Sequence, residues 1–341
     1  MSQAADRRAG GERELVDWLR RRAGDALGDD GAVLRLAGEW VVTVDAQHEG
    51  VHHPEGLDPF LAGRRLLAVN LSDLAAMGAQ PRAAFLSLAA PERYDRKRFL
   101  NGLLSGCRAA GLELQGGDLS TLDRLSGTLT LLGQRAPGGR WLRRRSALPG
   151  DDLWVGGSLG EAAAGLAILD RVILPRRGLP QPRLGSGRTS RAAGRALRRH
   201  LVPSPQLELG TELSRKTRVA AIDCSDGLGI DLARLCSASG VGAEVDLTSL
   251  PLPDADLCRA LELDPIELAL AGGEDYVLLF AMSARSRAPR HPGARKIGRI
   301  THRPGVIAID AQRCRRDISK LGYDHLVPTG RSATTGRSAT T

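Results

Sequence analysis

Aspartates stand at the ends of short apolar stretches in several separate parts of the sequence. VVTVD, VNLSD and LELQGGD each end on one aspartate, AAIDCSD carries two, and GDD places a pair just before an apolar run: these are Asp45, Asp73, Asp118, Asp223 with Asp226, and Asp29 with Asp30. Strand ends in α/β folds are where ligands bind, so we expect these carboxylates to gather. Gathered carboxylates repel one another unless a cation compensates them.

Oxygen ligands without a nearby His or Cys cluster favour Mg²⁺ over zinc. Mg²⁺ held by a few carboxylates usually keeps waters and phosphate oxygens in its remaining positions, so the pattern predicts a site for a polyphosphate. Each aspartate taken singly has another interpretation, because Asp is a favoured helix N-cap. Asp73 before LAAMG and Asp226 before GLGIDLARL would both suit that role.

The common nucleotide-binding motifs are missing. The sequence contains no GxxxxGK[ST], no HRD and no DFG, and GSGRTS at 185–190 departs from GxGxxG at its last position. This excludes the usual P-loop, protein-kinase and Rossmann sites. Glycine-rich turns at 116–117, 156–160 and 272–273 could let backbone N–H groups approach phosphates, although each is also a common tight turn.

Helix and strand patterns alternate in the first half of the chain. Helices are predicted at 11–23, 61–78 and 96–112, the last closed by Gly111, and strands within 28–36, 39–45, 81–90 and 125–134. A basic segment rich in Gly and Pro follows at 136–152, and we place a domain boundary near 148.

The second half continues the alternation. Residues 152–169 read as strand, glycine turn and helix, residues 219–247 as strand, acidic turn, helix and strand, and 271–282 and 294–300 as two further strands. We therefore predict an α/β (α+β) protein with an N-terminal domain at 1–148 and a C-terminal α/β domain at 149–328. The repeat TGRSATTGRSATT at 329–341 predicts a disordered tail.

The net charge of +9 comes mostly from arginine, which supplies 44 of the 48 basic residues. Its densest stretch, 171–199, is interpreted as a solvated surface and loop, with a phosphate-rich partner as the alternative. No nucleic-acid-binding signature accompanies the charge. Five cysteines without a CxxC pair, a charged N-terminus and the lack of a long apolar run favour a cytoplasmic protein outside the membrane.

Taken in order, the motifs resemble the thiamine-monophosphate kinase family, within the superfamily of aminoimidazole ribonucleotide synthetase. The matching strings include GDD at 28–30, TVDAQHEGVH at 43–52, AVNLSDLAAMGAQP at 68–81, QGGD at 115–118, LPGDDLWVGGSLGEAAAGLAIL at 148–169, IDCSDGLGIDL at 222–232, GGEDYVLLF at 272–280 and GYDHL at 322–326. The resemblance covers about residues 25–327.

The resemblance implies an aminoimidazole ribonucleotide synthetase-like fold. Its N-terminal domains bind ATP and metal and pair across a homodimer, their sheets form a barrel, and the active site lies between the two domains of each subunit. The implied reaction is the ATP-dependent conversion of thiamine monophosphate to thiamine diphosphate. Because the acceptor is already an anion, Mg²⁺ and positioning would carry most of the catalysis.

The resemblance also implies roles for individual residues. The Mg²⁺ ligands would be Asp30, Thr43, Asp45, Asp73, Asp118, Asp223 and Asp226, and four of these, Asp30, Asp73, Asp118 and Asp223, would be catalytic. ATP would contact Gly117, Asp118, Arg144 and Ser225, and the acceptor would contact His52 and Glu274.

The sequence departs from the family pattern at several places. Val44 replaces a hydroxyl residue, Leu119 to Thr121 replace TTRG, His53 stands where an aromatic residue is common, and Lys320 or Leu321 replaces an aromatic residue near the end. Two alternatives therefore stay open: another ATP-using enzyme of this superfamily with a different acceptor, and a nucleotide or metal sensor without catalysis.

Overall fold

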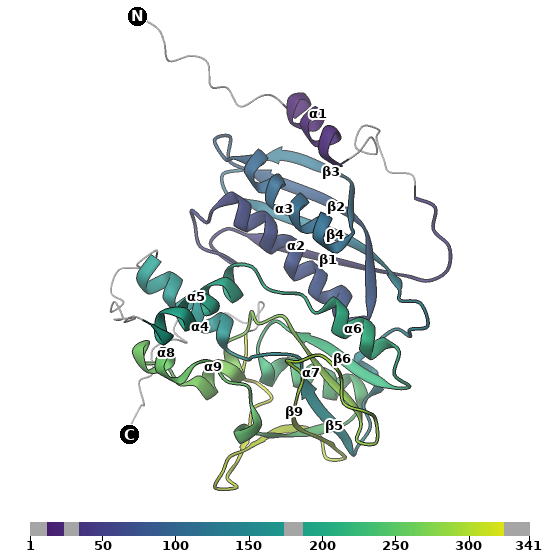
Figure 1. Ribbon diagram of the computed structural model, residues 1–341, viewed down its shortest axis with the longest axis vertical. Coiled ribbons are helices and arrows are strands. Elements are labelled where there is room, and N and C mark those ends of the chain that lie inside the picture. The colour runs from purple at the N-terminus through teal and green to yellow at the C-terminus, as the bar shows by residue number, and fades with distance from the viewer. Residues whose placement is uncertain (1–11, 24–33, 174–186, 324–341) are drawn as a thin grey trace, which may run out of the picture.

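The computed structural model describes residues 12–23, 34–173 and 187–323, and in Figure 1 two sheet-and-helix layers are stacked along the long axis. Asp30 and the predicted tail at 329–341 lie outside the described residues. In the described part of the chain, no helix is both long and apolar enough to cross a membrane.

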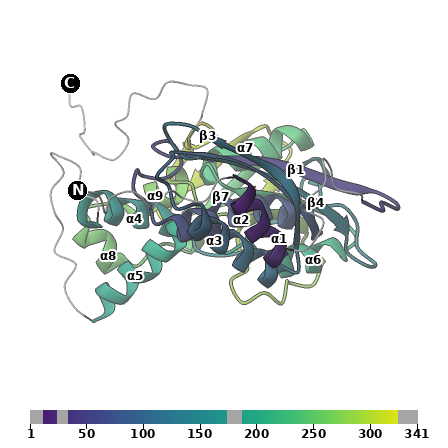
Figure 2. The ribbon, with the colours of Figure 1, turned by 90° about the horizontal axis from the view of Figure 1, so that it is seen from above.

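The first layer is a four-stranded sheet in the order β1-β4-β2-β3. Its strands are β1 (Trp40–His48), β2 (Ala79–Ala90), β3 (Glu113–Thr121) and β4 (Ser126–Arg135). Only the β2–β3 pair is parallel, while β4 runs antiparallel to both of its neighbours. Helices α1 (Glu12–Ala23), α2 (Pro59–Ala76) and α3 (Arg96–Ala110) lie on the same side of this sheet (Figure 2).

Helix α2 is buried on most of its circumference, with 13 of its 18 residues buried. Asp58 caps its first turn by accepting hydrogen bonds from Phe60 N and Leu61 N, and Pro59 occupies the first turn. Glycines let it approach α3 closely, because a methyl group at Gly63 would overlap the carbonyl oxygen of Phe99. The helix is therefore fixed between its sheet, α3 and the second half of the chain.

The other face of the first sheet carries no helix among the described residues. Val42 and Val44, which alternate with Thr43 and Asp45 along β1, are 58% and 60% exposed there. An apolar sheet face of this kind is typical of an interaction surface.

The second layer is a seven-stranded mixed sheet in the order β11-β10-β7-β9-β5-β8-β6. Its strands are β5 (Asp151–Val155), β6 (Val219–Cys224), β7 (Gly242–Asp246), β8 (Val277–Ser283), β9 (Arg295–Thr301), β10 (Gly305–Ile309) and β11 (Arg315–Asp317). Its helices are α4 (Glu161–Ile168), α5 (Arg188–Leu201), α6 (Leu207–Ser214), α7 (Leu228–Ser239), α8 (Ala255–Ala260) and α9 (Pro265–Ala271), with a 3-10 turn η1 (Arg144–Ser146) just before β5.

The two halves share a hydrophobic core. Ala75 and Ala76 at the end of α2 pack with Leu209 and Leu213 of α6 against β6 and β8, whose contribution includes Phe280. Figure 1 shows α6 between the two layers, beside the end of α2. This shared core fixes the end of α2 against β6.

The sequence-based fold class, α/β (α+β) with an aminoimidazole ribonucleotide synthetase-like architecture, is confirmed. The strand predicted within 28–36 is wrong over its described part, since residues 34–36 are not in a strand. The interpretation of 171–199 as surface and loop is also wrong in part, because α5 begins at Arg188 and Arg171 is buried, where it donates to Leu261 O at 2.6 Å.

Candidate active site

Two predicted aspartates from opposite halves of the chain meet where α2 ends. Asp73 lies in the last turn of α2, and Asp223 is the fifth residue of β6. Thr43 Oγ1 of β1 donates to Asp73 Oδ2 at 2.5 Å, and Ser72 Oγ of α2 donates to Asp223 Oδ2 at 2.9 Å. Strand β1, helix α2 and strand β6 thus bring two hydroxyls and two carboxylates together.

The pKa values of both aspartates are raised. Burial first, and then repulsion by Asp73 and Asp231, raise the pKa of Asp223 to about 7, while the Ser72 hydrogen bond and Arg144 oppose this shift. Burial also raises the pKa of Asp73, against the Thr43 hydrogen bond and Arg144. The ionised pair is under-compensated, which is the condition that a bound cation relieves.

Arg144 is a cation whose charge reaches both aspartates. It belongs to η1, and its carbonyl oxygen accepts a hydrogen bond from Ser239 Oγ of α7 at 2.6 Å. Its exposed side chain lowers the pKa of both Asp73 and Asp223. A guanidinium beside two carboxylates can also reach the phosphates of a ligand bound at them, as the predicted ATP contact requires.

Asp45 lies beside the same helix, one turn before Asp73. Its backbone N donates to Asn70 Oδ1 at 3.1 Å, and Asn70 Nδ2 donates in turn to Leu66 O at 2.9 Å. Asp45 Oδ1 accepts a hydrogen bond from Ala46 N at 2.8 Å. Asn70 therefore sets the distance between β1 and α2 where the predicted metal ligands Thr43, Asp45 and Asp73 lie.

The turn after β6 has its own network. Asp231 Oδ2 accepts hydrogen bonds from Ser225 N at 3.0 Å and Asp226 N at 2.9 Å, and Arg234 forms ion pairs with both Asp226 and Asp231. Asp226 is thus partly neutralised by Arg234. Glycine 227, with φ of 120°, occupies the N-cap position of α7.

The N-cap interpretation of the aspartates is wrong for the two positions considered. Asp73 lies inside α2, whose cap is Asp58, and the cap position of α7 is Gly227 rather than Asp226. Neither carboxylate is therefore explained by helix capping.

Asp118 and Gly117 lie apart from this group within one chain. They belong to β3, at the opposite edge of the sheet from β1, which is about 14 Å away at three strand spacings. Asp118 pairs with Ser87 of β2, and a methyl group at Gly117, whose φ is 156°, would overlap Leu86 O. The convergence expected of all the aspartates is seen for Asp73 and Asp223, with Asp45 near them, and Asp118 is not brought to them.

No complete metal site is formed by protein side chains over residues 12–23, 34–173 and 187–323, where no three His, Cys, Asp or Glu side chains group suitably. Mg²⁺ is commonly held by only one or two carboxylates plus phosphates and waters. The donor set at Asp73 and Asp223, with oxygen atoms and raised carboxyl pKa values, fits such an ion.

The GGED turn carries Glu274 into the region between the halves. Glu274 N donates to Ser225 O at 2.6 Å, which ties this turn to the turn after β6, and Glu274 adopts a φ of 66°. The next residue, Asp275, is buried and accepts hydrogen bonds from Gly160 N at 2.5 Å and Ala162 N at 3.0 Å. Burial raises the pKa of Asp275 to about 7, against these two bonds.

His52 lies in the loop after β1. Its Nδ1 accepts a hydrogen bond from His48 N at 3.0 Å, and its own N donates to His48 O at 2.9 Å. The adjacent His53 is buried, and burial lowers its pKa. The structure therefore fixes the backbone around His52 by a local turn.

Sequence reasoning missed Asn70, Ser72, Asp231 and Arg65, which hold the predicted residues in place. Asn70 and Ser72 could have been found, because a polar residue inside an otherwise apolar helix needs a partner. Asp231 bonds to groups five and six residues before it, so its role depends on the local turn after β6. Arg65 bonds to groups that only the tertiary fold brings near, so the sequence contained no comparable signal for it.

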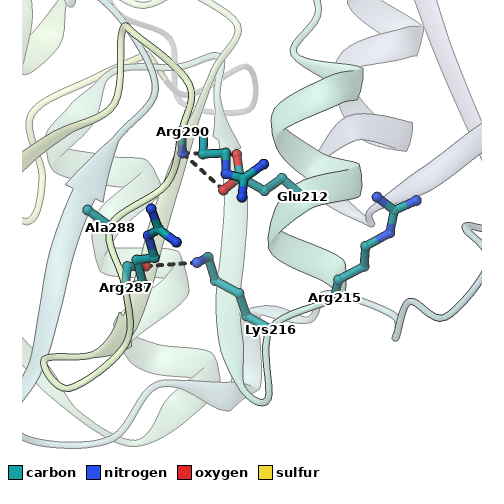
Figure 3. A pocket seen from close by; sticks show the side chains of 6 residues that line it. All are labelled: Glu212, Arg215, Lys216, Arg287, Ala288 and Arg290. Atoms are coloured by element: carbon teal, nitrogen blue, oxygen red, sulfur yellow. Dashed lines mark hydrogen bonds between the residues drawn. The ribbon is translucent and has the colours of Figure 1, made fainter.

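Hollows lined by described residues also lie on the surface away from these side chains. One, of about 280 Å³, lies between the end of α6 and the loop after β8 and is lined by Glu212, Arg215, Lys216, Arg287, Ala288 and Arg290 (Figure 3). Another, of about 530 Å³, runs along α6 and the start of β2. Their linings include none of the predicted site residues, so we place the candidate site at the acidic residues instead.

Family models match most of the chain. A model described as AIR synthase related protein, N-terminal domain, matches residues 28–134, and the corresponding C-terminal domain matches residues 149–310. The predicted boundary near 148 falls between these two matches.

Curated relatives and solved structures agree with this match. The thiamine-monophosphate kinase of Salmonella typhimurium is 38% identical over 265 residues, 76% of this chain and 77% of the relative. That of Aquifex aeolicus is 30% identical over 322 residues, 92% of this chain and 98% of the relative.

Among solved structures, the thiamine-monophosphate kinase from Stenotrophomonas maltophilia has a TM-score of 0.72 and 34% identity, with 87% of this chain and 96% of that chain covered. AaThiL complexed with AMPPCP and TMP has a TM-score of 0.71 and 30% identity, with 87% and 93% covered. On these similarities, the chain belongs to the thiamine-monophosphate kinase family.

Proposed function

We propose that the protein transfers the terminal phosphoryl group of ATP to thiamine monophosphate, giving thiamine diphosphate and ADP. Family membership supports the reaction, and the related structure holding an ATP analogue together with thiamine monophosphate supports both substrates. The observation that carries the proposal is the pairing of Asp73 and Asp223 across the two halves.

The chemistry needs charge compensation more than a base. The phosphate of the acceptor is already an anion near neutral pH, so the main barrier is bringing two anionic groups into line. Bound Mg²⁺ would supply the positive charge that compensates the phosphates. Asp73 and Asp223 would hold it, together with Asp45, Thr43 and the other predicted ligands, Asp30, Asp118 and Asp226.

The chain's own groups would orient the two substrates. Arg144 would contact the ATP phosphates, with Ser225 from the turn after β6 and Gly117 from β3 completing the predicted ATP contacts. Glu274 and His52 would lie on the side of the acceptor. Five unpaired cysteines and the use of ATP support a cytoplasmic location as part of the same proposal.

We also propose that the active form is a homodimer in which Asp118 comes from the partner copy. One chain leaves Asp118 at the sheet edge opposite β1, and no described helix covers the sheet face with exposed Val42 and Val44. A second copy that placed its β3 edge beside β1 would cover this face and bring its Asp118 and Gly117 toward Asp45.

Mixing two inactive variants tests the shared site. Asp73→Asn and Asp118→Asn proteins are unfolded, mixed in equal amounts and refolded, so that half of the dimers are mixed. If Asp118 acts across the dimer, each mixed dimer has one intact site and the sample regains about a quarter of wild-type activity. No regained activity would mean that both residues act within one chain.

The reaction itself is tested by incubating the wild-type protein with ATP, Mg²⁺ and thiamine monophosphate and separating the products. Thiamine diphosphate and ADP in equal amounts are expected. ATP turnover only with another phosphorylated acceptor would replace the proposed acceptor, and ATP binding without turnover would indicate a sensor.

A further inference from the structure

Arg65 is the largest side chain that is fully buried in the described part of the protein, with 1% of its side chain exposed. It lies on α2, two helical turns before Asp73. A buried guanidinium is costly unless its N–H groups find acceptors. Arg65 was not part of any sequence-derived prediction.

Its three nitrogens donate to three different segments. Nε donates to Gln47 Oε1 of β1 at 2.9 Å, one terminal nitrogen donates to the carbonyl oxygen of His200 at the end of α5, and the other forms an ion pair with Glu274 Oε2. Gln47 belongs to the first half of the chain, and His200 and Glu274 to the second. One side chain therefore joins both halves at the loop that carries Glu274.

Glu274 is fixed from several directions. Its Oε2 faces Arg65, its Oε1 lies 3.5 Å from the hydroxyl of Tyr276, and its backbone N donates to Ser225 O. Glu274 and Tyr276 have φ values of 66° and 49°, a region that non-glycine residues adopt only when surrounding contacts impose it. The Glu274 side chain nevertheless remains 24% exposed.

His200 does not compete with Arg65 for this carboxylate as a cation. Its Nδ1 is 3.8 Å from Glu274 Oε2 and has no hydrogen-bond partner among the described residues. Burial first, and then the nearby Arg65, lower the pKa of His200 to about 4. His200 is thus neutral at pH 7, and the positive charge facing Glu274 is that of Arg65.

We propose that Arg65 is a positioning residue for the acceptor: it holds Oε2 of Glu274, so that Oε1, which receives only a long 3.5 Å contact from the Tyr276 hydroxyl, contacts the substrate. This inference rests on the proposed function, in which Glu274 lies on the acceptor side. The group recognised by the remaining oxygen would be a hydrogen-bond donor or a cation, and thiamine offers both in its amino group and its positively charged ring. The predicted ATP contacts do not include Glu274.

The test compares Arg65→Lys with Arg64→Lys. Arg64 is the adjacent residue on α2, is only partly buried and donates weakly to Ser105 Oγ at 3.4 Å, so it is a matched control. Lysine keeps the charge at position 65 but cannot reach three acceptors. We expect the KM for thiamine monophosphate to rise about tenfold in Arg65→Lys, with the KM for ATP changed less than about twofold. The control should change neither constant.

A second variant separates positioning from folding. Arg65→Met leaves Glu274 without its partner and should be strongly destabilised, whereas Arg65→Met combined with Glu274→Met removes both charges at similar volume. The double variant should recover the thermal midpoint lost in Arg65→Met but keep a KM for thiamine monophosphate raised about tenfold or more.

Two results would overturn the inference. In one, Arg65→Lys lowers the thermal midpoint but leaves the KM for the acceptor unchanged. In the other, the KM values for ATP and acceptor rise equally. A wild-type protein that forms no thiamine diphosphate overturns the proposed function itself, and the acceptor role of Glu274 with it, so the two failures are distinguishable.

Discussion

Helix α2 meets the second half of the chain at two buried polar contacts of opposite character. Near its middle, Arg65 pairs with Glu274, so opposite charges are compensated by the protein alone. Two turns later, about 12 Å along the helix, Asp73 lies close to Asp223, and Arg144 compensates the like charges only in part. The Arg65–Glu274 pair needs no ligand once the chain has folded. The Asp73–Asp223 pair needs a bound cation to offset its repulsion.

The contrast separates stability from function. A buried pair of opposite charges becomes destabilising when one partner is removed, because the other is left unpaired. A buried pair of like charges becomes less destabilising when one is removed. Variants at the two ends of α2 should therefore have opposite effects on the free energy of unfolding, although both should reduce activity.

The largest effect is expected at the acidic contact. Asp223→Asn or Asp73→Asn should lower kcat/KM by about a thousandfold or more, because each removes a predicted metal ligand. Without Mg²⁺, the thermal midpoint should be unchanged or higher, since the repulsion is relieved. Kinetic assays and thermal unfolding measure both, with the exposed Asp123→Asn as the control. Full activity in both variants would contradict the assigned role.

Binding of Mg²⁺ at Asp73 and Asp223 should stabilise the folded protein. At a concentration of about 100 times its Kd, Mg²⁺ should stabilise the wild-type protein by about 2.7 kcal/mol, and chelation should reverse this. Asp223→Asn should show a smaller gain. Thermal unfolding with MgCl₂, compared with KCl at equal ionic strength, makes the measurement. Equal gains in both proteins would place the ion elsewhere.

The position of the acidic end depends on α6. A methyl group at Gly210 would overlap the carbonyl oxygen of Ala75, two residues after Asp73. Gly210→Ala should therefore destabilise the protein by about 2 kcal/mol and lower kcat by displacing the end of α2.

Gly194→Ala on α5 is the matched control, because its added methyl group would meet only Arg198 at 3.7 Å. It should stabilise the protein by about 0.5–1 kcal/mol through helix propensity. If both glycine variants retain wild-type activity, α6 does not set the position of Asp73.

The smallest effect on stability is expected at an ion pair near the protein surface. Glu244 of β7 accepts hydrogen bonds from Arg315 and Arg299, and these bonds hold its pKa below the ordinary value of 4.5. Glu244→Gln should cost only about 0.5 kcal/mol, because the two arginines are mostly exposed.

The pH dependence of this contact has a definite sign. Because the folded pKa of Glu244 is depressed, its contribution is present above pH 4.5 and is lost as the pH falls through the folded value. The stabilities of wild type and Glu244→Gln should therefore converge as the pH falls from 4.5 through the depressed folded pKa of Glu244. A difference that persisted or grew there would exclude the ion pair as its cause.

The sequence predicted most of the strands and helices that position the site, because their apolar periodicity is strong. Helix α2 and the strand–turn–helix around Asp223 are examples, and both carry residues that a resemblance assigned to the site. The sequence predicted that carboxylates would gather at strand ends, and the approach of Asp73 to Asp223 agrees with that prediction.

The sequence could not predict how those residues are held. Arg65 stands beside Arg64 in a pattern that resembles any basic helical surface, and only the packing of α5 and the GGED turn explains its burial. The placement of Asp118 depends on strand order, which the local pattern does not specify, and β3 itself interrupts its apolar pattern with two glycines.

The uncovered face of the first sheet bears on how the protein should be handled. If a second copy covers Val42 and Val44, folding and association are linked, and the thermal midpoint rises with protein concentration. Dilution would then lower the thermal midpoint of the protein, and assays at nanomolar enzyme concentration would underestimate its activity. Substituting a charged residue at Val44 would fix the chain in its dilute, single-copy state.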